Sequence, residues 1–174
     1  MDRYVKFAEG KSFSRDDIKR LCENKARVIE YGELAKYRSI DSAIGPHGAL
    51  VVLYETRESY GHWCAIMRVD ELTLEFFDPY GFPMDRELQM INPYFREVSG
   101  QDRPHLSYLV AHSQYDLIQN GRPLQRFAKD TNTCGRWVGL RITLRRLPLK
   151  QFIRLFVKQK FPPDWYVTAL TLFV

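Results

Sequence analysis

The spacing of hydrophobic residues changes twice along the chain, and each change predicts a different kind of element. Between residues 15 and 23 apolar side chains recur at helical intervals, and Ser14 stands three positions before Asp17 as a capping pair. We therefore expect an amphipathic helix over 15–23. A second, shorter helical stretch is predicted over 30–37, before a cluster of turn residues.

The middle of the chain has the pattern of strands. Three runs of apolar, β-branched and aromatic residues are separated by charged or glycine-containing turns, and they cover 49–54, 63–69 and 72–77. Each run has the length of a strand. We expect consecutive strands of one central sheet, and a further strand is predicted over 106–112.

Helical spacing returns towards the C-terminus. A buried helix is predicted to begin at Gly135, and Pro148 suits the first turn of another. Helices on both sides of a strand-rich middle predict an α+β domain, with a central sheet flanked by helices. With 174 residues and 45% hydrophobic content the chain can bury one core, so we expect a single domain over 1–174.

Targeting and membrane segments are not expected. The first residues are charged throughout, and no apolar run approaches the ~18 residues of a membrane span. The cysteines number three at wide spacing, which suits neither a disulfide framework nor a zinc site. These patterns favour an intracellular protein with reduced thiols, no membrane contact and no metal.

Positive charge is concentrated in one segment. The chain has a net charge of +5, but residues 122–160 hold eleven basic residues against one acid, while the remainder is net negative. A helical segment this basic could follow a phosphate backbone through salt-dependent contacts. The alternative is a solvated face on which these side chains only cover apolar helix surface with their stems. The candidate contacts to nucleic acid are Arg141, Arg145, Lys150, Arg154 and Lys158.

The neighbours of Cys134 favour a catalytic thiol. A thiol attacks carbonyls as the thiolate, and a cysteine at a helix N-terminus is favoured by unpaired backbone N–H groups and by the helix dipole. Asn132 and Thr133 are suitable capping residues, and Gly135 leaves room for a substrate backbone to approach. For a cysteine considered alone, core burial would be the better interpretation.

A base and a carboxylate are predicted on neighbouring strands. Of the four histidines, His62 stands at the start of a strand, and Asp78 ends the strand that follows. In an antiparallel hairpin the carboxylate could bind one imidazole nitrogen while the other faces the thiol. Pro79 favours this arrangement because it holds Asp78 extended. Singly, these residues suit core or turn roles; together with Cys134 they predict a catalytic triad.

The order of these residues resembles that of a known protease family. His62-Trp63, the segment 77–82, a glutamine and Cys134-Gly135 are similar to the adenovirus maturation protease and its relatives in other large DNA viruses and virophages. More distantly they resemble the SUMO-deconjugating proteases. The resemblance covers most of the domain and implies a papain-like site reached by a permuted chain, with the general base, its orienting carboxylate and the nucleophile in that order.

The resemblance also implies a side-chain amide that binds the oxyanion together with the backbone N–H of the nucleophile. Gln125 is the candidate, although its gap of nine residues to Cys134 is longer than the family pattern and predicts an inserted loop over 127–132. Gln119 and Asn132 are the substitutes. A surface polar residue is the alternative interpretation of Gln125.

Further site residues follow from the same resemblance. Trp63 would cover a narrow cleft that admits small residues, typically glycine, before the scissile bond, although an aromatic on a strand more often packs in a core. Trp137 is expected to pack. Cys64 should face away from Trp63 with nothing nearby to activate it, and Cys22 should lie on the apolar side of the first helix.

These expectations favour a cysteine endopeptidase that cleaves capsid or core precursors, as a monomer, in the virion and in a viral factory of the host cytoplasm or nucleus. The chemistry needs no cofactor, but DNA or an activating peptide could serve as one. Two alternatives stay open. One is a deconjugating protease for ubiquitin-like proteins, for whose docking surface the chain has little spare material. The other is a noncatalytic nucleic-acid-binding module, which the complete triad argues against.

Overall fold

The computed structural model describes residues 2–174 and is built around a five-stranded mixed sheet in the order β1-β2-β3-β4-β5. The two outer pairs, β1 with β2 and β4 with β5, are parallel, whereas β2, β3 and β4 form an antiparallel meander. The strands are β1 (Arg27–Glu30), β2 (Ala49–Arg57), β3 (Tyr60–Arg68), β4 (Thr73–Phe77) and β5 (Asp116–Gln119).

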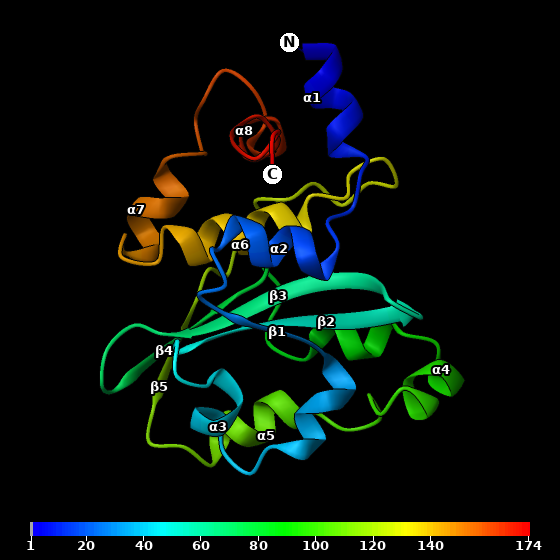
Figure 1. The fold of residues 1–174 in the computed structure, drawn as a ribbon, viewed down its shortest axis with the longest axis vertical. Coiled ribbons are helices and arrows are strands. Elements are labelled where there is room, and N and C mark those ends of the chain that lie inside the picture. Colours follow the sequence, from blue (N-terminus) through cyan, green and yellow to red (C-terminus); the bar gives the residue numbers. More distant parts are fainter. Residues whose placement is uncertain (1) are drawn as a thin grey trace.

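Helices cover both faces of the sheet (Figure 1). One face carries the two ends of the chain, which lie side by side, and its helices are α1 (Asp2–Glu9), α2 (Arg15–Leu21), α6 (Cys134–Thr143), α7 (Leu149–Arg154) and α8 (Pro163–Leu170). The other face carries η1 (Tyr31–Lys36), α3 (Ile40–Ile44), η2 (Arg86–Met90), α4 (Pro93–Val98) and α5 (His105–Ala111).

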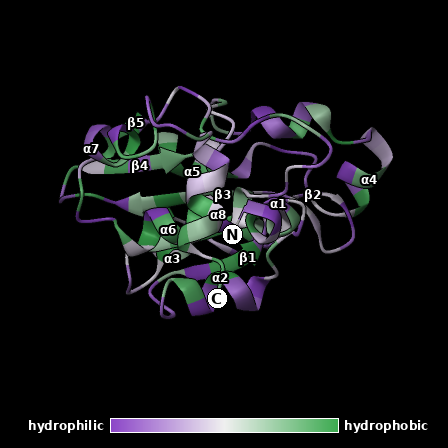
Figure 2. Ribbon diagram, turned by 90° about the horizontal axis from the view of Figure 1, so that it is seen from above, coloured by the Kyte–Doolittle hydropathy of each residue, from purple (hydrophilic) through white to green (hydrophobic). Residues whose placement is uncertain are grey.

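Two apolar cores lie on the two faces of the sheet. The first joins the sheet to α2, α6 and α7 around Trp137 and Phe152, and the second joins it to η1, α3 and α5 around Tyr54 and Phe76. Figure 2 shows the hydrophobic residues gathered in the central strands, with hydrophilic residues along the outer loops. Because alternate residues of β3 enter different cores, His62 and Cys64 share one face while Trp63 lies on the other.

The predicted α+β class and the central sheet are confirmed. The three predicted middle strands are β2, β3 and β4, and α2 begins after Ser14, whose side chain forms a reciprocal capping box with Asp17. The helices predicted from Gly135 and Pro148 are α6 and α7. The stretch 30–37 is a 3₁₀ helix preceded by β1, which the pattern did not predict.

The strand predicted over 106–112 is wrong, because this segment forms the helix α5. Its buried residues are Leu106, Leu109 and Val110, which recur at helical intervals and enter the second core. The short apolar run is compatible with both the strand period and the helical period. The segment forms a helix because its apolar face packs against the sheet.

Arg141, a predicted nucleic-acid contact, is buried, so that prediction is wrong. Its guanidinium donates to both carboxylate oxygens of Glu75 on β4, at 2.7 and 2.8 Å, and to the carbonyls of Leu144 and Leu147 at 2.9 and 3.0 Å. The charged head also lies 5.0 Å from the ring centre of Phe152. A buried bidentate pair of this kind ties α6 to the sheet, and it is unavailable to a polyanion.

Candidate active site

The hairpin of β3 and β4 brings His62 and Asp78 together. In the antiparallel register Ala65 lies opposite Phe77, so Asp78 follows at the level of the first half of β3. His62 Nε2 and Asp78 Oδ1 are 2.7 Å apart, and both side chains are buried. The pairing predicted from the sequence is therefore present in the fold.

Hydrogen bonds hold both the backbone and the carboxylate of Asp78 in place. Its backbone N–H donates to Asn120 Oδ1 at 3.1 Å, and Asn120 Nδ2 donates back to the Asp78 carbonyl at 2.6 Å. The backbone N–H of Tyr80 donates to Asp78 Oδ1 at 2.7 Å. Since an ionised carboxylate only accepts hydrogen bonds, His62 Nε2 carries the proton of the shared bond and Nδ1 is left for another partner.

The imidazole of His62 is further fixed by the ring of Tyr80, which stacks on it with centroids 4.2 Å apart and planes 12° apart. Burial lowers the pKa of His62, but the Cys64 thiol and the Asp78 carboxylate raise it, and the net pKa lies well above its ordinary value. Burial raises the pKa of the Cys64 thiol well above its usual range. Cys64 is therefore neutral near pH 7, and Asp78 is the partner that keeps the proton on His62.

Cys134 is the first residue of α6. Thr133 occupies the N-cap position, but its side chain makes no capping bond and instead donates to Asp164 Oδ1 at 2.5 Å. Trp137 Nε1 donates to the same oxygen at 3.0 Å, so Asp164 of α8 anchors the first turn of α6. The first backbone N–H groups of the helix are thus left without a side-chain cap beside the thiol, where they favour negative charge.

A cleft of about 210 Å³ joins these groups. The Cys134 thiol is among the groups that raise the pKa of the His62 imidazole. The residues that line the cleft are Thr56, Tyr60, Gly61, His62, Tyr80, Glu87, Met90, Gln125, Phe127, Asn132 and Cys134. Cys134 and His62 therefore meet in one cavity, with Asp78 behind the imidazole.

Gln125 also lines the cleft and is buried. Its Nε2 donates to the Thr131 carbonyl at 3.2 Å and to the Tyr80 hydroxyl at 3.3 Å, while its Oε1 is buried without a hydrogen-bond partner among residues 2–174. The bond to Tyr80 is long, so this N–H is the donor that a substrate oxyanion could most readily capture.

The two substitutes for Gln125 are less suitable. Asn132 lines the cleft, but its Nδ2 donates to the Gly10 carbonyl at 2.9 Å. Gln119 lies exposed on β5 and is absent from the cleft lining. The predicted loop over 127–132 is present as an irregular segment, and it contributes Phe127 to the cleft.

Trp63 and Gly135, the predicted substrate contacts, pack in the core instead. Trp63 is buried, and its Nε1 donates to the Phe13 carbonyl at 3.3 Å. A Cβ on Gly135 would lie 2.6 Å from the Cβ of Phe13 and 3.4 Å from Trp63, so the glycine permits close packing of α6. The space that we expected a substrate to use is filled by the protein, and both predictions are wrong.

Cys64 lies near His62 and Asp78, which the sequence around it does not predict. It shares a face with His62, and the ligand atoms of His62, Cys64 and Asp78 all lie within 4.8 Å of one another. Nitrogen, sulfur and oxygen ligands of this kind suit Zn²⁺. In the structure, His62 Nε2 and Asp78 Oδ1 of this group are joined by a hydrogen bond.

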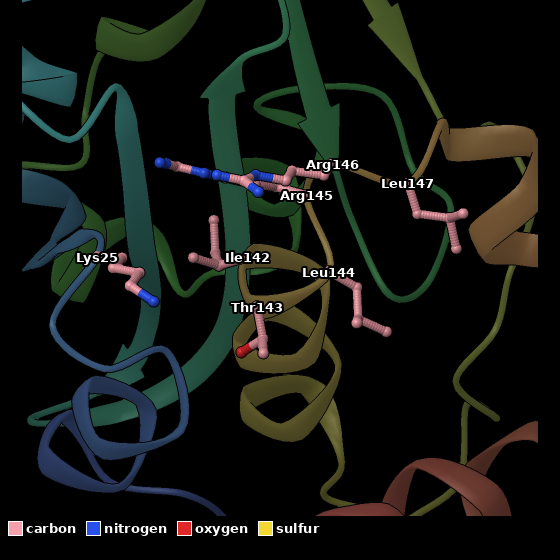
Figure 3. Close-up of a pocket in the computed structure, with 7 residues that line it drawn as sticks. All are labelled: Lys25, Ile142, Thr143, Leu144, Arg145, Arg146 and Leu147. Atoms are coloured by element: carbon pink, nitrogen blue, oxygen red, sulfur yellow. The ribbon is translucent and has the colours of Figure 1, made fainter.

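Four of the five predicted polyanion contacts lie at the surface. Lys150, Arg154 and Lys158 are exposed, and Arg145 is half-buried with one N–H donated to the His47 carbonyl at 2.7 Å. Arg145 also lines a hollow of about 710 Å³ at the C-terminal end of α6, which Figure 3 shows together with Arg146. Cations at this position are favoured by the negative end of the helix dipole.

Three contributors to the site were not predicted as such. They are Tyr80, which the sequence places only within the segment 77–82, Glu87 and Asp164. Asp164 had a signal, because an acid next to Pro163 suits the first turn of a helix. No sequence signal predicts the long-range contact of Asp164 with α6.

The structure defines an α+β protein in which a cysteine, a histidine and an aspartate meet beside a cleft. No family model matches the chain. It is 37% identical over 172 residues to the uncharacterized protein V9 of Sputnik virophage, an alignment that covers 97% of this chain and 98% of V9.

The chain belongs to the family of this virophage protein and is a viral protein. Within the described part of the chain, no helix combines the length and the apolar character needed to cross a membrane.

Proposed function

We propose that this protein is a cysteine endopeptidase that processes capsid or core precursor proteins at glycine-containing sites. The observation that carries the proposal is the convergence in one cleft of Cys134, at the uncapped start of α6, with His62, whose imidazole is hydrogen-bonded to Asp78. A thiol, a base and an orienting carboxylate gathered at one cleft are the groups that thiol catalysis uses, which supports the proposal. The kinship with a virophage protein supports action on virion proteins, in the virion and in the viral factory of the host cell.

In the proposed mechanism, each step of acyl transfer has a candidate residue. His62 Nδ1 takes the proton of the Cys134 thiol, and the thiolate attacks the scissile carbonyl while Asp78 keeps the other imidazole nitrogen protonated. The backbone N–H of Cys134 and an N–H of Gln125 stabilise the oxyanion. His62 then gives its proton to the leaving amine. Water, deprotonated by His62, hydrolyses the thioester and releases the second product.

A noncatalytic role as a nucleic-acid-binding module explains less of the molecule. It gives no reason for an imidazole fixed by both a carboxylate and a stacked tyrosine in front of a thiol. It also has one basic contact fewer than the sequence predicts, because the Arg141 guanidinium is hydrogen-bonded to Glu75.

The proposal is tested by incubating the purified protein with candidate virion precursors and with glycine-containing peptides, followed by mass spectrometry of the products. We expect new termini next to glycine, formed at the same sites in precursor and peptide. Intact precursors and peptides under reducing conditions, with the protein folded, would contradict the proposal.

We further propose that DNA binds the exposed basic residues after α6 and serves as a cofactor or track. Replacing Lys150, Arg154 and Lys158 together with glutamine should weaken binding and flatten its salt dependence, since each phosphate contact contributes a slope of about −0.9 in log K against log salt. Fluorescence anisotropy of a labelled duplex measures both. Lys36→Gln, in η1 on the opposite face of the sheet, serves as a control. Binding that does not respond to salt would exclude this partner.

A further inference from the structure

Glu87 is a carboxyl group in the cleft for which the catalytic steps have no use. It lies on η2 at 7% exposure and lines the same cleft as Cys134 and His62. Its Oε1 is buried and has no hydrogen-bond partner among residues 2–174. An acceptor that has lost its water without gaining a donor is costly, so its retention beside a reactive centre points to a partner supplied by a ligand.

The segment that carries Glu87 is held firmly. Asp85, at the start of η2, accepts hydrogen bonds from the hydroxyls of Tyr31 and Tyr54 at 2.8 and 2.9 Å and from the backbone N–H of Ser107 at 2.8 Å. These bonds tie η2 to β2, η1 and α5. A carboxyl group on a support fixed in this way has the rigidity expected of a recognition residue.

The charges around Glu87 indicate what that partner carries. Burial raises its pKa to about 7, with His62 lowering it and Asp78 raising it. The thiolate–imidazolium pair of the catalytic residues has no net charge, so a negative charge in the cleft would have to come from the carboxyl groups of Asp78 and Glu87. A cation that enters the cleft would pair with the Glu87 carboxylate and, by lowering its pKa, would favour the ionised form.

We propose that Glu87 forms a specificity subsite that binds a basic side chain of the substrate near the scissile bond. The subsite rests on the proposed endopeptidase activity and adds a charge requirement to it. Met90, from the same 3₁₀ helix, lines the cleft beside Glu87 and offers an apolar surface for the methylene stem of a lysine or arginine.

The test uses peptides in which arginine, citrulline or norleucine occupies each position around the scissile bond in turn. Citrulline keeps N–H donors without the charge. For the native protein, we expect arginine to raise kcat/KM about tenfold or more over both neutral residues at one position. Glu87→Gln should bring this ratio close to one. The ratio compares two substrates on one enzyme, so a general loss of folding or of His62 function would not change it.

Glu58→Gln removes the same charge from an exposed turn near the cleft and should leave the preference unchanged. A native enzyme that cleaves all peptides equally would overturn the subsite while leaving the endopeptidase intact. A Glu87→Gln variant that loses activity equally on arginine and norleucine peptides would also overturn it, because Glu87 would then bind a main-chain N–H. Absence of any cleavage by the native protein would instead contradict the proposed function.

Discussion

Replacing Cys134 with alanine should abolish proteolysis, with a fall in kcat/KM of at least about 10⁴-fold. The substitution removes the sulfur that forms the thioester in the proposed mechanism, while His62, Asp78 and the helix N-terminus stay in place. Because the cleft is otherwise intact, the variant should still bind the peptide with similar affinity. Initial rates of peptide cleavage and a fluorescence titration of the same peptide measure the two effects separately.

Cys22→Ala is the matched control for this experiment. Cys22 is also buried and free, but it lies at the end of α2, away from the cleft lining. Its variant should cleave peptides at close to the native rate. Equal cleavage by native protein and by the Cys134→Ala variant would show that the thiol is not the nucleophile.

Replacing Arg141 with methionine should lower the free energy of unfolding by about 3–5 kcal/mol. The change leaves the Glu75 carboxylate buried with no partner for its charge, and it also frees the carbonyls of Leu144 and Leu147. Urea denaturation followed by tryptophan fluorescence measures the loss. Further replacement of Glu75 with leucine should recover much of it, since an apolar pair of similar volume has no desolvation penalty.

Lys150→Met provides the comparison, because this exposed cation should change stability by no more than about 0.5 kcal/mol. The two variants also separate burial from surface charge. If Arg141→Met weakened DNA binding while leaving the unfolding midpoint unchanged, the guanidinium would belong to the surface and the ion pair with Glu75 would be contradicted.

The local part of the site could be predicted from the sequence. His62 lies on β3 and Asp78 directly follows β4, and these strands are joined by a short turn, so the period of the two strands and the proline after Asp78 are enough to place the two residues together. Cys134 at the start of a helix was predicted on similarly local grounds. The approach of that helix to the hairpin depends on long-range packing. The sequence therefore predicts that Cys134 and His62 act together, but it does not give their relative position.

Two of the wrong predictions concern residues whose contact partner is distant in the sequence. A basic residue on a helix was assigned to the surface from its charge, but Arg141 finds a buried carboxylate on β4. The signal was Glu75, an acid within an apolar strand run, since a buried charge requires a partner elsewhere. Gly135 was assigned to substrate approach because glycine permits any close contact, and the sequence does not say that the contact is Phe13.

The most direct test of the endopeptidase is a crystal structure of the protein with a glycine-containing peptide aldehyde. We predict a covalent bond between Cys134 Sγ and the aldehyde carbon, with the resulting oxygen within hydrogen-bond distance of the Cys134 backbone N–H and of Gln125 Nε2. The peptide should lie in the cleft beside His62 and Tyr80. An adduct on Cys64 or Cys22, or a peptide that leaves Cys134 unmodified at saturating concentration, would contradict the assignment of Cys134 as the nucleophile.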